Sequence, residues 1–152
     1  MRLEDVLHAD DVTTDLPTGD KDSTLRGLAR LFCRNDGLLN EEAVYRAFVE
    51  REQVASTGIG SGVAMPHGRL RVERPRMALA ICREGLQFDS LDGEPARILV
   101  ALLTPYEHPG HQIKMLARVS RVLRDSAVRE RLLSAQSRTD ALRILVEEDL
   151  RH

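Results

Sequence analysis

The pattern of apolar and polar positions divides the chain into a helical beginning, a strand-rich middle and a helical end. From residue 21 to 35, apolar side chains recur at three- and four-residue steps, which predicts an amphipathic helix. Asn40, followed by two glutamates, is typical of an N-cap, so we expect a second helix from there to Val54. A short helix is expected at residues 3–7, before a loop marked by Pro17.

The middle of the chain carries short continuous apolar runs instead of a helical period. They cover residues 63–65, 77–82 and 98–103, with a weaker run at 86–88. Runs of this length, bounded by Gly, Pro and charged residues, are typical of strands that are buried on both faces. Helical spacing then returns at 110–124, at 127–135 with Ser126 as the expected cap, and at 138–149.

Helices on both sides of a block of buried strands indicate a layered α/β protein. The 152 residues are enough for one domain with a substantial core. We therefore expect a single layered domain over residues 1–152, with a small mixed central sheet flanked by helices on both faces.

Composition excludes several classes of function. The net charge is −2, from 22 basic and 24 acidic residues, and aromatic residues make up 3% with no Trp, so we expect no nucleic-acid partner. No apolar run is long enough to cross a bilayer, and no signal-peptide pattern precedes the first helix, so we expect no membrane insertion. Cys33 and Cys82 lie in apolar contexts typical of reduced core thiols, which favours a cytoplasmic protein.

The stretch TGIGSGVAMPHG, residues 57–68, is the strongest candidate for chemistry. Its glycines do not have the G-x-G-x-x-G spacing of a dinucleotide loop, and a strand-like run follows instead of a helix, which disfavours a nucleotide site. His108 and His111 could join His67 as metal ligands, but the pair flanks a Pro-Gly step and lacks closing ligands. We rank a metal site below a metal-free one.

A third interpretation starts from Pro-His-Gly itself. Pro66 fixes its own backbone and keeps Met65 extended, so His67 should project from the end of a strand in a set direction. Gly68 leaves room for a group to approach the backbone closely. This arrangement suits a nucleophilic imidazole that accepts an anionic group.

The run REQVASTGIGSGVAMPHG, residues 51–68, closely resembles the active-site signature of a known family. The family is the IIA domains of the bacterial phosphoenolpyruvate-dependent phosphotransferase system, fructose/mannitol type. The segments FDSLDGEPARILVALLTP and HQIKMLARVSRVLRD also resemble their counterparts in family members, so the likeness covers most of the chain.

The resemblance implies a phosphocarrier that takes a phosphoryl group from phosphohistidine on an HPr-type carrier protein, without a metal or another cofactor. The acceptor histidine of the family corresponds to His67, and its active-site arginine corresponds to Arg51. Other residues of the signature are expected to shape the phosphoryl pocket: Thr57, Gly58, Gly60 and Gly68.

A second histidine is common in the family at the start of the helix that follows the last strand. The matching position here holds Gln112, and His111 lies one residue earlier. We therefore expect His111 to have a secondary role in the pocket, with Gln112 as the alternative.

The resemblance leaves the biological branch open. A short chain favours the nitrogen-regulatory branch, in which the phosphorylation state selects regulatory target proteins. The alternatives are a sugar-specific IIA protein that passes the group to a cysteine of a IIB domain, and an interaction module of the same fold without chemistry.

Overall fold

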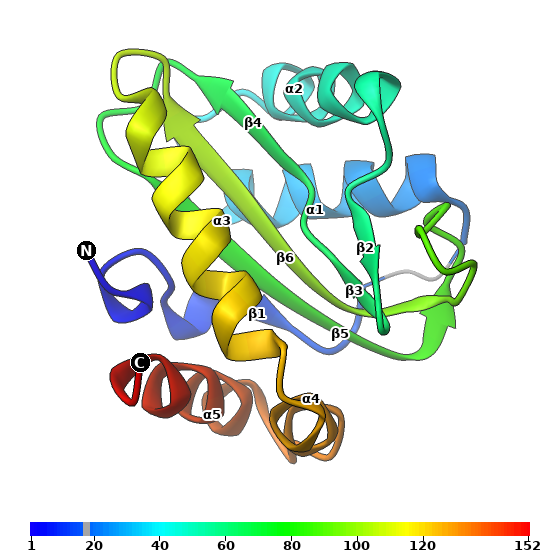
Figure 1. Ribbon diagram of the computed structural model, residues 1–152. Helices are drawn as coiled ribbons and strands as arrows, with labels where there is room; N and C mark the ends of the chain where they lie inside the picture. The colour runs from blue at the N-terminus through cyan, green and yellow to red at the C-terminus, as the bar shows by residue number, and fades with distance from the viewer. Residues whose placement is uncertain (17–18) are drawn as a thin grey trace.

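A computed structural model describes residues 1–16 and 19–152 of the chain (Figure 1). Its centre is a six-stranded mixed sheet in the order β1-β5-β6-β3-β2, and β4 also pairs with β6. The strands are β1 (Val12–Thr13), β2 (Gly58–Gly60), β3 (Val63–Ala64), β4 (His67–Leu70), β5 (Arg76–Leu86) and β6 (Ala96–Pro105). β5 and β6 are antiparallel, whereas β3 and β4 run parallel to β6. The expected mixed sheet is confirmed.

Helices cover both faces of this sheet (Figure 1). The helices are η1 (Leu3–Asp5), η2 (Ala9–Asp11), α1 (Lys21–Asn35), α2 (Glu41–Val54), α3 (Pro109–Leu123), α4 (Ser126–Leu133) and α5 (Arg138–Leu150). α1 and α2 pack on one face, and α3, α4 and α5 pack on the other. The layered α/β architecture expected from the sequence is therefore confirmed.

The two faces of β5 carry side chains of different size. Successive residues of a strand point to opposite faces, so alternate positions enter different cores. The larger residues Met77, Leu79 and Ile81 join the core under α3 and α5. The smaller residues Ala78, Ala80 and Cys82 join the core under α1 and α2, where they allow the helices to lie close to the sheet. A run that looks uniformly apolar in the sequence thus builds both cores.

The shortest elements differ from the sequence predictions. Within residues 3–7, only Leu3–Asp5 are helical, as the 3₁₀ turn η1. The run at 86–88 is not a separate strand, because β5 already extends to Leu86. The strands β1, β2 and β4 were not expected, because they contain only two to four residues and no clear apolar alternation.

Helix starts were predicted with mixed success. Asn40 caps α2 as expected, and its side chain accepts a hydrogen bond from Ala43 N at 3.0 Å. The cap expected at Ser126 is wrong: Ser126 is the first residue of α4, and the Asp125 carboxylate accepts from Ala127 N at 2.9 Å. Both residue types favour this position, so the sequence alone allowed either assignment.

Other expectations concern single residues. Cys82 is buried and Cys33 is partly buried, both as free thiols, and burial raises the pKa of Cys82 to about 11. Pro17, which was expected to mark a loop, lies outside the described residues. Across residues 1–16 and 19–152, none of the helices combines the length and the apolar character that a bilayer crossing requires.

Asp149, near the end of α5, ties the two ends of the chain together. Its side chain is 1% exposed, and one carboxylate oxygen accepts a hydrogen bond from Leu3 N at 2.8 Å. The other oxygen accepts from Arg118 Nε of α3 at 2.5 Å. One buried carboxylate therefore holds η1, α3 and α5 in place.

Asp149→Ala is expected to lower the free energy of unfolding by about 2 kcal/mol, because it leaves Leu3 N–H and Arg118 without their partner. Glu147→Ala is the matched control on the same helix, since Glu147 is exposed and, among the described residues, its one ion pair is with Arg143. Urea unfolding followed by circular dichroism measures both changes. An equal loss of unfolding free energy in the two variants would contradict the role given to Asp149.

Gly68 of β4 lies directly against Ala47 of α2. A Cβ atom at position 68 would be 2.8 Å from the Ala47 Cβ and 3.1 Å from its carbonyl carbon. Neither atom belongs to a flexible side chain, so any larger residue would push β4 and α2 apart. The absence of a side chain at Gly68 sets the spacing between these two elements.

Gly68→Ala is expected to lower the free energy of unfolding by about 1–3 kcal/mol through this overlap. Gly37→Ala serves as the control, because a Cβ atom there would meet nothing within 4 Å. Urea unfolding of the two variants tests the difference. A Gly68→Ala protein as stable as the wild type would show that the spacing is adjustable.

Candidate functional site

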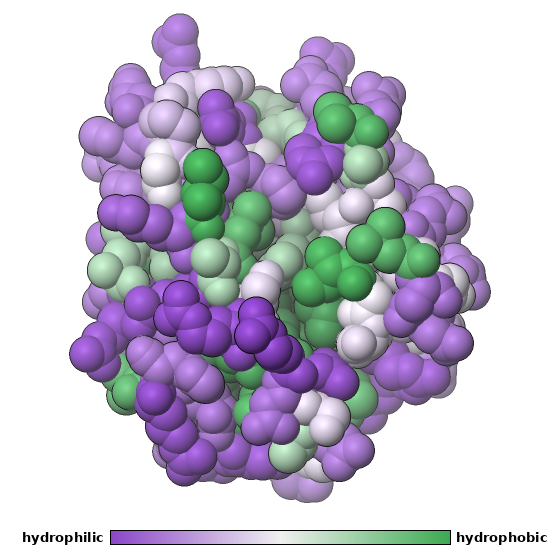
Figure 2. Space-filling view, in the orientation of Figure 1, coloured by the Kyte–Doolittle hydropathy of each residue, from purple (hydrophilic) through white to green (hydrophobic). Residues whose placement is uncertain are grey.

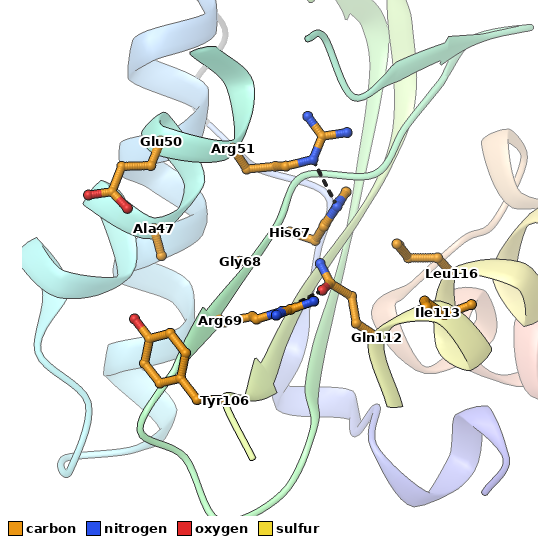
Figure 3. A pocket seen from close by; sticks show the side chains of 10 residues that line it. All are labelled: Ala47, Glu50, Arg51, His67, Gly68, Arg69, Tyr106, Gln112, Ile113 and Leu116. Atoms are coloured by element: carbon orange, nitrogen blue, oxygen red, sulfur yellow. Dashed lines mark hydrogen bonds between the residues drawn. The ribbon is translucent and has the colours of Figure 1, made fainter. Parts of the chain in front are cut away.

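A cavity of about 520 Å³ opens between α2, β4 and α3 (Figure 3). Its lining consists of Ala47, Glu50 and Arg51 from α2, His67, Gly68 and Arg69 from β4, Tyr106, and Gln112, Ile113 and Leu116 from α3. The molecule is hollowed between α3 and the strands β2 and β3, and apolar side chains gather around the hollow (Figure 2). The lining of the cavity therefore combines charged and polar side chains with apolar ones.

His67 is held by the sheet rather than by a loop. It is the first residue of β4, not the last residue of a strand as expected, and it pairs with Leu102 of β6. Leu102 belongs to the core under α3, so the imidazole points to that face. The side chain is only 8% exposed. Its position therefore depends on the rigid pairing of β4 with β6.

The hydrogen bonds of His67 define which ring nitrogen carries the proton. Nδ1 lies 2.8 Å from the carbonyl oxygen of Met65, which can only accept, so Nδ1 is the protonated nitrogen. Nε2 lies 3.1 Å from Nε of Arg51, which can only donate, so Nε2 holds the lone pair. Both contacts select the same neutral tautomer, with Nε2 toward the cavity.

The surroundings of His67 favour its neutral form. Burial is the main cause that lowers the pKa of the imidazole below its ordinary value of 6.5. The Met65 carbonyl and the negative charge of Glu52 raise this pKa, whereas the positive charges of Arg51 and Arg69 lower it. A neutral imidazole is the nucleophilic form of histidine, so the site keeps a nucleophile available at neutral pH.

Arg51 reaches His67 from the last turn of α2. Its Nη1 donates to the Ala55 carbonyl oxygen at 2.8 Å, which anchors the guanidinium to the end of its own helix. The neighbouring Glu52 turns away and pairs with Lys21 at 2.6 Å. Arg51 is therefore a cation beside His67 without a carboxylate partner in the described part of the chain.

Gln112, not His111, enters the cavity from α3 (Figure 3). His111 lines another hollow, together with Met1 and Lys114, and does not line the His67 cavity. The cause is the start of α3 at Pro109, because successive residues of a helix point in directions about 100° apart. A shift of one residue in the start of α3 would therefore change which side chain faces the His67 cavity.

Of the other expected pocket residues, only Gly68 lines the cavity; Thr57, Gly58 and Gly60 do not. Thr57 is buried and its backbone N donates to the Glu52 carboxylate. Gly60 has φ of 95° in the turn between β2 and β3. These residues belong to the hairpin ahead of β4 and lie outside the lining of the His67 cavity.

Arg69 lines the cavity but was not predicted from the sequence. Its Nε donates to Oε1 of Gln112 at 3.0 Å. Residues two apart on a strand share a face, so the spacing of Arg69 from His67 was the signal available in the sequence. That signal depended on recognising β4 as a strand.

The histidine pair considered for a metal lies at the start of α3. His108 is the N-cap residue, and its ring stacks on His111 with 4.9 Å between centroids. Within the described ranges, no group of three His, Cys, Asp or Glu side chains is arranged to hold a metal ion. The pair also lies outside the His67 cavity.

Comparisons with known proteins agree with this geometry. A nitrogen regulatory protein of Pseudomonas aeruginosa is 31% identical over 148 residues, covering 97% of this chain and 96% of its own. The fructose-specific EIIA component of Haloferax volcanii is 31% identical over 137 residues, covering 90% and 89%. The crystal structure of the nitrogen regulatory protein IIA-Ntr from Neisseria meningitidis superposes with a TM-score of 0.86 at 29% identity, covering 93% and 97%.

The family model described as "Phosphoenolpyruvate-dependent sugar phosphotransferase system, EIIA 2" matches residues 5–148. This range includes every element that lines the cavity, from α2 to α3. The fold, the relatives and the family match agree, and the chain belongs to the EIIA 2 family of the phosphoenolpyruvate-dependent sugar phosphotransferase system.

Proposed function

We propose that the protein is a cytoplasmic phosphocarrier in which Nε2 of His67 accepts a phosphoryl group from the phosphohistidine of an HPr-type carrier. The observation that carries the proposal is the fixed tautomer of His67, with a lone pair on Nε2 and a cation beside it. Family membership supports the same chemistry.

The transfer is a substitution at phosphorus. The lone pair of Nε2 forms the new N–P bond while the N–P bond on the donor's histidine breaks, and the electron pair of that bond stays on the donor's nitrogen. The proton on Nδ1 remains shared with the carbonyl oxygen of Met65. One N–P bond forms for each that breaks, so the transfer needs no reactant besides the two histidines and the phosphoryl group.

Arg51 compensates the charge that arrives. A phosphoryl group carries close to two negative charges, which a guanidinium can contact with two donors at once. Nε of Arg51 already points at Nε2, and it moves from the lone pair to a phosphoryl oxygen as the new bond forms. Anchoring by the Ala55 carbonyl oxygen keeps this movement short.

Labelling with phosphoenolpyruvate, the first enzyme of the phosphotransferase system and an HPr-type carrier tests the acceptor. Wild type is expected to gain an acid-labile phosphoryl group, whereas His67→Ala gains none. His111→Ala, which removes a histidine outside the cavity, is expected to be labelled like wild type.

Arg51→Gln should be labelled at least tenfold more slowly than wild type, because the loss of one charge-assisted hydrogen bond costs about 1.5 kcal/mol or more. Equal labelling of His67→Ala and wild type would overturn the proposal.

The pH dependence follows from the lowered pKa of His67. Protonation of Nε2 removes the nucleophile, and the lowered pKa means that the midpoint of this protonation should lie below the ordinary value of 6.5. Removing a neighbouring positive charge raises this pKa, so the midpoint in Arg51→Gln is expected at higher pH than in wild type. NMR titration of the His67 ring measures both midpoints. A wild-type midpoint above 6.5 would contradict the assignment.

The nitrogen-regulatory branch is our proposal for the role of the phosphorylated protein, through phosphorylation-dependent binding of target proteins. The nitrogen regulatory relative that covers 97% of the chain supports it. The fructose-specific relative at the same 31% identity keeps sugar transport as the second candidate. Discharge of the labelled protein onto a IIB cysteine separates the two: rapid discharge supports the sugar branch, and retention of the label supports regulation. An interaction module without chemistry would gain no label at all.

A further inference from the structure

We propose that Arg69 is a second phosphoryl-binding cation, which leaves Gln112 and contacts the phosphoryl group once it is on His67. The inference rests on the proposed acceptor role of His67 and adds a residue that was not expected from the sequence.

The register of β4 places Arg69 on the same side of the sheet as His67. His67 pairs with Leu102 and Arg69 pairs with Thr104 of β6, so the two side chains leave the strand toward the same face. Both line the cavity, with Arg51 on the far side of the imidazole from Arg69 (Figure 3). A group attached to Nε2 would therefore enter a space between two guanidinium groups.

Arg69 is held only weakly in the unphosphorylated protein. Its Nε donates to the neutral amide oxygen of Gln112, and no carboxylate lies within 4.0 Å of it among the described residues. For a guanidinium donor, a doubly charged phosphoryl group is a stronger acceptor than a neutral amide, because the attraction between opposite charges adds to the hydrogen bond. Exchange of Gln112 for the phosphoryl group is thus favourable.

The partly buried Arg76 and Arg118 differ from Arg51 and Arg69 because each has a carboxylate partner. Arg76 is held by Asp36 and Arg118 by Asp149, so their charges are already neutralised. The cavity has one acidic residue in its lining, Glu50, and its carboxylate points away from His67 (Figure 3). The charge around the imidazole is therefore positive before any phosphoryl group arrives, and Arg69 contributes to lowering the pKa of His67.

The main alternative is that Arg69 only ties β4 to α3 through Gln112. If Arg69 has only this structural role, Arg69→Gln should lower the stability of the protein without changing the ionisation of the phosphoryl group. A direct contact predicts the opposite, because a nearby cation favours the dianion and lowers the second pKa of the phosphoryl group.

Arg69→Gln, Arg69→Lys and the control Arg71→Gln are compared with wild type in the labelling reaction. Arg71 is exposed just beyond β4 and outside the His67 cavity, so its substitution removes the same charge without the contact. Labelling of Arg69→Gln is expected to be about tenfold slower than wild type. Arg69→Lys keeps the positive charge but not the planar guanidinium, so its labelling rate should lie between those of Arg69→Gln and wild type. The labelling rate of Arg71→Gln should match that of wild type.

A ³¹P NMR titration of the phosphorylated proteins measures the second pKa of the phosphoryl group. This pKa would not change if Arg69 only connected β4 to α3. The midpoint for the phosphoryl group should lie at higher pH in Arg69→Gln than in wild type, and Arg71→Gln should leave it in place. Urea unfolding of all three variants measures the contribution of the Gln112 contact to stability.

The outcomes separate this inference from the proposed function. If wild type is labelled on His67 but Arg69→Gln and Arg71→Gln behave alike in rate and in ³¹P midpoint, Arg69 does not bind the phosphoryl group and the phosphocarrier proposal stands. If wild type gains no label on His67, the phosphocarrier proposal itself fails.

Discussion

The close approach of α2 to β4 is the constraint on which the site depends. Gly68 has no side chain, and Ala47 occupies the space where a Cβ atom would lie. This contact brings the last turn of α2 to the start of β4, so that Nε of Arg51 comes within 3.1 Å of Nε2 of His67. A nucleophile from a strand and a cation from a helix meet because one residue between them is a glycine.

The electrostatics of the cavity follow from which charges are paired and which are not. Glu52, the acidic neighbour of Arg51, has partners elsewhere: it binds Lys21 and the backbone N–H of Thr57. The arginines that face His67 are held by neutral acceptors, the Ala55 carbonyl oxygen and the Gln112 amide oxygen. Burial of the imidazole and this unbalanced positive charge act in the same direction, because both disfavour a proton on Nε2.

The long elements and the central residues of the site could be predicted from the sequence, but the lining of the cavity could not. The apolar runs of β5 and β6 and the spacing in α1 are strong signals, and the family signature pointed to His67 and Arg51. Arg69 and Gln112 depended on details that a sequence does not fix: the pairing of the four-residue strand β4 and the residue at which α3 begins. Gly58 and Gly60 resembled pocket residues because turn-building and ligand-binding glycines look alike in a sequence.

The anchoring of Arg51 to Ala55 has a consequence for the direction of transfer. A cation that is fixed to its own helix end does not have to be gathered from solvent when the phosphoryl group arrives, and it does not disperse when the group leaves. In the proposed transfer through His67, the forward and reverse reactions then begin from nearly the same arrangement of the protein. Such a site makes the bound group exchangeable rather than permanent, so the phosphorylated fraction of the protein would follow the state of its donor.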